Sequence, residues 1–575
     1  MLAPSGSASR EAPDWAAIGV KLQGMWRDFL REQAEKPHSL PGADEWLASM
    51  SEWSQQFLSA AAGGLPPVRE GAAAPWQGIF GQNGDGDGDG GFAGAGQDAQ
   101  SLHAMLRQIH RMLAEQIMAA TDSPAGIAPS RHEQLRFALR TLIGTLNPDN
   151  FPLTNPQVIE RAIATRGESL VKGMTHLITD LRRGQLTHTD ADAFRLGENI
   201  AVTPGKVVHE TPLYQLIQYS PATSSVLAVP LIIFPPWINR FYILDLNPAK
   251  SFVRWAVEQG VTVFMVSWKS ADASLAEVIW DDYVRAQIDA IDMVRARLKV
   301  PAVHTIGYCV AGTTLAATLA VLARRGEADR VKSATFFTAQ VDFEEAGDLK
   351  HFIDDRQIEA IGRLAPEGYL DGRYLAAAFN LLRPDDLIWS YVVRNYLMGE
   401  DYPAFDLLHW NGDVTNLPAK WHCAYLRDLY RDNRLVEPDS LIVDGTPIDL
   451  HRIVTPCYIQ AGREDHIAPP RSGWKLTRYL AGPWIFLLAG SGHIAGVVNP
   501  PAPKKYGYRT NAGQADTLEQ FVAGADEHPG SWWPHWLGWL RTQDSTEVRA
   551  TGKRKPGGRG DKAIEDAPGR YVKMR

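Results

Sequence analysis

Cysteine is scarce in this chain of 575 residues, which contains only Cys309, Cys423 and Cys457. So few thiols exclude a disulfide framework and are typical of a reducing compartment. We therefore expect a cytoplasmic protein. Each thiol must then be judged by its surroundings, because a free cysteine is usually a small buried hydrophobe and only sometimes a nucleophile.

An excess of positive charge and a long apolar run are also missing. The formal net charge is −8, which gives no support to a nucleic-acid partner. The longest apolar stretch, residues 226–238, is interrupted by prolines and is too short to span a bilayer. Residues 1–7, MLAPSGS, have neither the basic start nor the apolar core of a signal peptide. We expect a soluble protein without a transmembrane segment.

One short stretch, VHTIGYCVAG at residues 303–312, combines an apolar strand with the start of a small-residue helix. Its pentapeptide GYCVA matches the nucleophile elbow G-x-S-x-G, with Cys309 in place of Ser and Ala311 in place of the last Gly. The elbow is a strained turn whose helix packs close to its strand, so the residues beside the nucleophile must be small. The pattern makes Cys309 a candidate nucleophile. The alternative is a buried, inert cysteine at a strand–helix junction.

Candidate partners for this cysteine follow two later strands. Asp465 lies in the turn after the apolar segment 455–462, and His493 follows the segment 484–488 in a glycine-rich loop. Open α/β sheets place their chemistry at the carboxyl ends of strands, and the order nucleophile, acid, base is that of α/β-hydrolases. Either residue alone would be an ordinary loop residue, but the order and placement together predict a Cys309–Asp465–His493 triad. His466 neighbours the acid, yet the order and the glycine-flanked loop favour His493 as the base.

The first two hundred residues are predicted to be mainly helical. Residues 1–62 form a helical N-terminal segment, because apolar residues recur at three- to four-residue spacing from Trp15. Residues 63–100 are predicted as a flexible linker rich in Gly, Pro and Asp. Its Asp alternation resembles the start of a calcium loop, but Gly96 stands where the bidentate Glu is needed. Residues 101–204 are predicted as a helical N-terminal domain.

From about residue 205 strands and helices alternate, which predicts a parallel sheet with helices on both faces. The first part of this core covers residues 205–339, and the second part, with the acid and the base, covers 453–545. Residues 340–452 lie between them, are rich in aromatics and are predicted as a cap that gates water and substrate. The predicted strands are 226–234, 261–268, 303–308 and 331–338, and the predicted helices are 248–260, 277–298 and 310–325.

The C-terminal region has two parts. Residues 531–540 contain four Trp, which indicates an amphipathic helix docked on the core; the alternative is a patch that touches an apolar surface. We favour docking. Residues 546–575 form a basic tail that we expect to be mobile until its last few residues.

With these features placed, residues 140–545 and the end of the tail resemble the polyhydroxyalkanoate synthases, in particular their single-subunit class. The resemblance implies an α/β-hydrolase fold with a mainly parallel central sheet, a large cap and a helical N-terminal domain. Ala311 departs from the commoner Gly, a change that this family tolerates. The motifs that carry the resemblance are GYCVAGT at 307–313, PPWINRFYILDL at 235–246, WNGDVTNLP at 410–418, REDHI at 463–467 and GSGHI at 490–494.

The resemblance implies an activity. Such enzymes polymerise (R)-3-hydroxyacyl-CoA, here with 3-hydroxybutyryl-CoA as the expected monomer, and release CoA through an acyl-cysteine. It further implies a homodimer at the surface of cytoplasmic polymer granules, with no cofactor and no metal. One rival is a polyester depolymerase or acyl-CoA thioesterase on the same fold, which passes the acyl group to water. Another is a non-catalytic granule-surface protein, against which an intact triad argues.

Further site residues follow from the chemistry and from the motifs. The Val310 N–H, next after the nucleophile, is the first candidate for an oxyanion hole. The second donor comes from the loop after 226–234, whose prolines have no N–H, and we favour Ile238 over Trp237. Trp410 and Asp413 are predicted to line the substrate entrance or to order the cap, with a structural role favoured. Cys457 is predicted to be buried and inert, and Cys423 to have a packing role.

Overall fold

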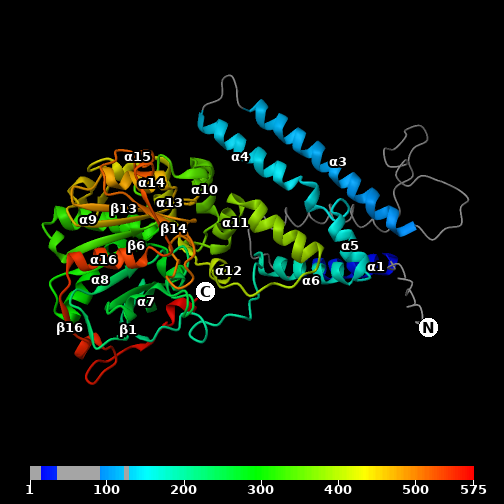
Figure 1. The fold of residues 1–575 in the computed structure, drawn as a ribbon. Coiled ribbons are helices and arrows are strands. Elements are labelled where there is room, and N and C mark those ends of the chain that lie inside the picture. The colour runs from blue at the N-terminus through cyan, green and yellow to red at the C-terminus, as the bar shows by residue number, and fades with distance from the viewer. Residues whose placement is uncertain (1–14, 35–90, 122–128) are drawn as a thin grey trace, which may run out of the picture. The chain divides into compact units, whose positions relative to one another are not determined.

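The computed structural model describes residues 15–34, 91–121 and 129–575. The chain divides into a helical unit within residues 1–188 and 377–403, and an α/β unit of residues 189–376 and 404–575 (Figure 1). Most of the predicted linker, and residues 1–14 and 35–62 of the predicted N-terminal segment, lie outside the described residues. The part of the linker that is described, residues 91–100, belongs to a helix.

The helical unit confirms the helical character predicted for the N-terminal region. Trp26 and Phe29, from the first apolar stripe, are buried against Ile178. Its helices are α1 (Trp15–Ala34), α3 (Gly91–Ala120), α4 (Pro129–Thr145), α5 (Pro156–Ala164), α6 (Glu168–Arg183) and the π-helices η6 (Asp385–Trp389) and η7 (Val392–Leu397).

Residues 377–403 differ from the prediction, which assigned them to the cap. Here η7 packs on α6 at Gly173, where a Cβ would lie 1.8 Å from the carbonyl oxygen of Tyr396. The Tyr396 hydroxyl donates to Asp180 of the same helix at 2.5 Å. Such a close backbone approach requires glycine, and the contact places this segment in the helical unit.

The α/β unit is built on a sheet in the order β15-β14-β13-β12-β7-β6-β4-β5-β2-β1-β17. The central strands from β13 to β5 are parallel, and the strands at both edges are antiparallel. This confirms the mainly parallel sheet. The strands are β1 (Gly205–Glu210), β2 (Tyr214–Tyr219), β4 (Leu231–Phe234), β5 (Val263–Trp268), β6 (Val303–Tyr308), β7 (Val331–Phe337), β12 (Cys457–Gly462), β13 (Trp484–Ala489), β14 (Gly507–Thr510), β15 (Asp526–Pro529) and β17 (Glu565–Asp566).

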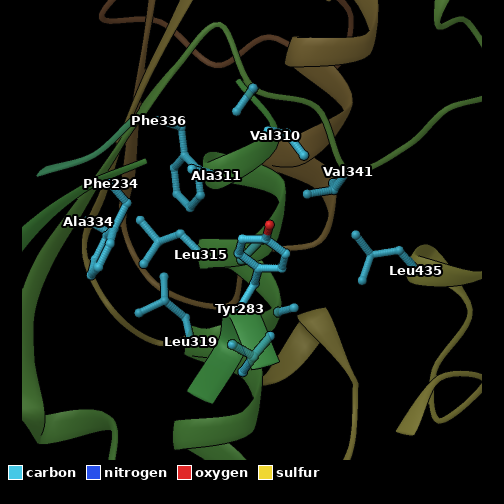
Figure 2. Close-up of a cluster of buried hydrophobic side chains, with 14 of the residues drawn as sticks. Phe234, Tyr283, Val310, Ala311, Leu315, Leu319, Ala334, Phe336, Val341 and Leu435 are labelled. Atoms are coloured by element: carbon cyan, nitrogen blue, oxygen red, sulfur yellow. The ribbon is translucent and has the colours of Figure 1, made fainter. Parts of the chain in front are cut away.

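Helices cover both faces of this sheet, and each face has its own buried cluster. On one face, Leu315 and Tyr283 pack toward Phe234 and Phe336 of the strands (Figure 2). The helices of that face are α8 (Trp280–Leu298), α9 (Val310–Arg324), α14 (Pro470–Lys475) and α15 (Leu518–Ala523), and those of the other face are α7 (Phe252–Glu258) and α16 (Trp533–Gln543).

The tryptophans of residues 531–540 belong to this second core. Trp532, Trp533 and Trp536 are completely buried, and the indole N–H of Trp536 donates to Thr335 of β7 at 3.0 Å. Docking of a terminal helix is therefore confirmed. These side chains offer no patch for an outside surface.

Two predictions about the chain's ends and edges are wrong. The strand predicted at 226–234 is split into β3 (Ser225–Leu227) and β4, because Pro230 cannot donate to a sheet ladder. The basic tail is not mobile: its strand β16 (Glu547–Arg549) pairs with β3, and β17 pairs with β1. Arg554 of this segment donates to two carbonyl oxygens, those of Leu227 at 3.1 Å and of Ala228 at 2.6 Å.

The rest of the segment predicted as a cap is a set of short elements. The elements are α10 (Asp355–Arg363), α11 (Gly372–Leu382), α12 (Asp406–Gly412), α13 (Ala419–Tyr425), the π-helix η8 (Leu426–Arg431) and the strand pairs β8–β9 (Tyr369–Leu370, Leu417–Pro418) and β10–β11 (Ile442–Val443, Thr446–Pro447).

None of the helices in the described part of the chain combines the length and apolar character needed to cross a bilayer.

Candidate active site

Cys309 lies in the turn between β6 and α9, with φ +54° and ψ −128°. Non-glycine residues seldom adopt positive φ, and such strain persists only where the surrounding structure imposes it. Here the constraint is the contact between strand and helix, since a Cβ on Gly307 would lie 2.5 Å from the Cα of Gly312. Cys309 is thus held at a sharp strand–turn–helix junction, as the elbow motif predicts.

Asp465 and His493 meet at the carboxyl ends of β12 and β13. His493 Nδ1 lies 2.7 Å from Asp465 Oδ2. The other carboxylate oxygen accepts from the backbone N–H groups of Ile467 at 2.8 Å and Ala468 at 2.9 Å. Because the aspartate is buried with both oxygens engaged, it holds the imidazole in one orientation. The histidine whose ring nitrogen bonds Asp465 is His493. His466 is the next residue after Asp465 in the same turn.

The charge state of His493 depends on both neighbours. Burial lowers the pKa of its imidazole, but the charges of Asp465 and Cys309, and hydrogen bonds with both, raise that pKa above its ordinary value. Since Nδ1 faces Asp465, Nε2 is left for the sulfur. The structure therefore brings together the three residues that the sequence order paired, and the charges around His493 favour its protonated form.

Val310 and Ile238 belong to the two segments that flank this junction. Val310 is the first residue of α9, and within the described ranges no acceptor for its N–H is found. In the loop after β4, the carbonyl of Trp237 accepts from the Thr415 hydroxyl at 2.6 Å. The C=O and N–H of a trans peptide point in opposite directions. The Ile238 N–H therefore points away from Thr415.

Trp410 and Asp413 lie in a buried network that holds this loop. The Trp410 indole donates to the carbonyl of Arg240 at 2.7 Å. Asp413 accepts from the Tyr242 hydroxyl at 2.8 Å and from Arg240 Nε at 3.4 Å. Both predicted residues are at most 8% exposed, so these contacts favour ordering the loop over lining an entrance.

The other two cysteines lie outside the elbow. Burial raises the pKa of the Cys457 thiol, which lies inside β12, and that of the Cys423 thiol in α13. A thiol that resists deprotonation is a poor nucleophile. Both placements agree with the packing roles predicted for them.

Several polar groups near the nucleophile have no counterpart in the sequence prediction. The Tyr308 hydroxyl donates to the carbonyl of His493 at 3.0 Å. Burial and the charge of Cys309 raise the pKa of Tyr425 and Tyr430, which come from the cap segment. The sequence showed that this segment is rich in aromatics, but no spacing rule identifies which of its phenols the charge of Cys309 reaches. Among the described residues, no group of three or more His, Cys, Asp or Glu side chains is arranged to hold a metal ion.

Comparison with known proteins decides the family. Residues 88–256 match the model of the poly-beta-hydroxybutyrate polymerase (PhaC) N-terminus, and residues 256–500 match that of the alpha/beta hydrolase fold. A poly(3-hydroxyalkanoate) polymerase of Methylorubrum extorquens is 45% identical over 84% of this chain and 80% of its own length. The chain belongs to the poly(3-hydroxyalkanoate) polymerase family. Polymerase subunits of Rhizobium meliloti (44% identical over 82% of this chain and 77% of the relative) and Cupriavidus necator (45% over 77% and 76%) are also similar.

Proposed function

We propose that this chain polymerises (R)-3-hydroxyacyl-CoA, with 3-hydroxybutyryl-CoA as the expected monomer, into polyhydroxyalkanoate and releases CoA. The observation that carries the proposal is the arrangement of Cys309, His493 and Asp465 at the elbow of a chain from the poly(3-hydroxyalkanoate) polymerase family. Within it we assign Cys309 as nucleophile, His493 as base and Asp465 as the residue that orients the base.

Acylation is the first step. His493 takes the proton of Cys309, and the thiolate attacks the thioester carbonyl. The sulfur–carbon bond to Cys309 forms, the bond to CoA breaks, and the CoA thiolate takes up the proton from His493. One thioester replaces another, so the acyl group keeps its transfer potential. That is the chemical reason for a cysteine at this position.

Elongation uses the same base. The 3-hydroxyl of a bound unit or chain attacks the acyl-cysteine, His493 accepts the hydroxyl proton, and the Cys309 thiolate leaves. The product is an oxoester, which is more stable than the thioester consumed. Asp465 keeps Nδ1 protonated and stabilises the imidazolium that forms.

Both steps pass through a tetrahedral oxyanion. We assign its donors to the backbone N–H groups of Val310 and Ile238. Removing one such donor typically costs about 10²–10³ in rate. The Val310 group stands at the N-terminus of α9, where the helix dipole also favours negative charge.

The chemistry requires no cofactor or metal, because CoA enters as part of the substrate. We further propose a homodimer that works at the surface of cytoplasmic granules. The relatives' names support the polymer product.

The assay that tests the proposal separates it from hydrolysis and from a scaffold role. Purified protein is given 3-hydroxybutyryl-CoA, and released CoA, polymer and free acid are measured. We expect CoA release accompanied by insoluble polymer. Free 3-hydroxybutyrate in place of polymer would indicate a thioesterase or depolymerase. No release of CoA would indicate a non-catalytic granule protein.

A further inference from the structure

Gln340 lies just beyond the end of β7, the strand next to the one that carries the nucleophile. The Cys309 N–H donates to the carbonyl of Phe337, the last residue of β7, at 2.9 Å. The Thr313 hydroxyl, in the first turn of α9, donates to the carbonyl of Gln340 at 2.7 Å. These two bonds fix the backbone of residues 337–340 against the elbow.

The side-chain amide of Gln340 is buried and only half satisfied. Its Nε2 donates to the Tyr430 hydroxyl at 3.3 Å, while its Oε1 has no hydrogen-bond partner among the described residues. Gln340 is 5% exposed. Rotating the amide by 180° would exchange the two atoms and still leave one of them unpaired. A buried polar atom without a partner costs free energy and calls for an explanation.

A second unpaired group stands at the same strand end. Thr338, with φ +40°, is 2% exposed, and its Oγ1 has no partner in the part of the chain that the structure describes. Two unsatisfied polar atoms within three residues, beside a nucleophile, indicate a site for a polar group that arrives with a ligand.

Tyr430 links this amide to the nucleophile. The charge of Cys309 acts on the Tyr430 phenol and also on that of Tyr425. The Gln340 amide is therefore one hydrogen bond away from a phenol that the charge of Cys309 reaches, and its backbone is tied to the helix that begins at the nucleophile.

The segment is also rigid on its far side. Asp342, two residues beyond Gln340, accepts from Asn433 Nδ2 at 3.0 Å and from the Tyr479 hydroxyl at 2.7 Å. The Ser472 hydroxyl donates to its carbonyl. A polar group held in this way is preorganised for recognition and does not need to be ordered on binding.

We infer that Gln340 is a positioning and specificity residue whose amide hydrogen bonds to the 3-hydroxyl of the acyl group on Cys309. This inference rests on the proposed function and adds how the substrate class is chosen. A hydroxyl both donates and accepts, so it pairs with either orientation of the amide. An acyl chain without the hydroxyl leaves the buried amide unpaired. Sites of this kind discriminate strongly against the analogue that lacks the group.

The test compares acyl loading from 3-hydroxybutyryl-CoA and from butyryl-CoA. CoA release in a single turnover reports acylation alone, which does not consume the 3-hydroxyl. Wild type should load the hydroxylated substrate about 10- to 100-fold faster, as expected for one buried hydrogen bond. Gln340→Leu should bring this ratio close to one, mainly by slowing 3-hydroxybutyryl-CoA. Tyr430→Phe, which removes the partner that orients the amide, should lower the ratio less.

A matched control is Gln287→Leu. Gln287 is also completely buried, but both of its amide atoms are paired, with the Ala311 carbonyl and the Thr318 hydroxyl. This variant should lose stability and keep the preference. If Gln340→Leu fails to fold, the ratio in Tyr430→Phe still decides the matter.

Three results would overturn the inference. Equal slowing of both substrates in Gln340→Leu or Tyr430→Phe would mean a structural role. Equal loading of both substrates by wild type would contradict the role of Gln340 but not the proposed function. Release of CoA from neither substrate by wild type would contradict both the role of Gln340 and the proposed function.

Discussion

At the scale of single residues, the site depends on the two ring nitrogens of His493, which serve different partners, Asp465 and Cys309. One imidazole nitrogen is committed to a buried carboxylate at 2.7 Å, and the other is left for the sulfur. A thiol is far more acidic than an alcohol. The orienting carboxylate should therefore matter less for deprotonating Cys309 than for activating a 3-hydroxyl.

This difference predicts distinct defects for two variants. His493→Gln should lose acylation and elongation together, because it removes the base for both steps. Asp465→Asn should still form acyl-enzyme but elongate poorly, by roughly the 10²–10⁴-fold typical of general-base contributions. Trapping labelled acyl-enzyme while measuring polymer separates the two steps. The division of labour would be wrong if both variants lost acylation equally.

At the scale of elements, the loop after β4 is held by the segment 410–418, which begins in the last turn of α12. Thr415 bonds the carbonyls of both Trp237 and Ile238, at 2.6 and 2.7 Å. The donor that we assign to Ile238 therefore depends on a side chain from the cap. We therefore propose that the cap segment orders the oxyanion donor through Thr415.

Thr415→Val removes this bond while keeping the side chain's shape. We expect kcat to fall about tenfold, part of the loss typical of a missing oxyanion donor, with KM little changed. Stability should fall by about 1–3 kcal/mol, since the buried carbonyl of Trp237 and the partly buried carbonyl of Ile238 lose their donor. Thr175→Val on the exposed face of α6, where the hydroxyl bonds its own helix, is the matched control. A rise in KM with kcat unchanged would contradict the assignment.

Local patterns predict elements better than they predict partners. The strand 303–308 and the helix that starts at Val310 follow from periodicity and small residues, and they are found at those positions. Strands β16 and β17 pair with strands that are distant in the sequence, and such pairing leaves no local signal. For this reason the sequence wrongly predicts a mobile tail. The triad can be predicted because its residues follow the order nucleophile, acid, base and stand at the carboxyl ends of strands. The Gln340 amide follows no such rule, since its role depends on Tyr430, which lies far along the chain.

At the scale of the whole molecule, the three triad residues belong to the α/β unit, while the described part of residues 1–100 belongs to the helical unit. We propose that the N-terminal region governs association and granule targeting and does not take part in the chemistry. The predicted boundary between the linker and the helical domain, residues 100 and 101, falls inside α3, so a cut before Gly91 is the better place for a truncation.

Removing residues 1–90 takes away α1 and with it the cluster of Trp26 and Phe29 against Ile178. We expect lower thermal stability of the helical unit, a longer lag, and retained CoA release at high protein concentration. Calorimetry and CoA release measured on one preparation check this. A truncated protein that is folded but inactive at high concentration would show that the N-terminal region takes part in the chemistry.

The central claim is that Cys309 carries the acyl group, and mass spectrometry of the loaded protein tests it most directly. After incubation with 3-hydroxybutyryl-CoA, the peptide that contains Cys309 should carry the hydroxyacyl mass. Cys309→Ala should release no CoA, whereas Cys423→Ala and Cys457→Ala should keep most of the activity. A Cys309→Ala protein that still released CoA at a tenth of the normal rate, or an acyl group found on another residue, would contradict the account.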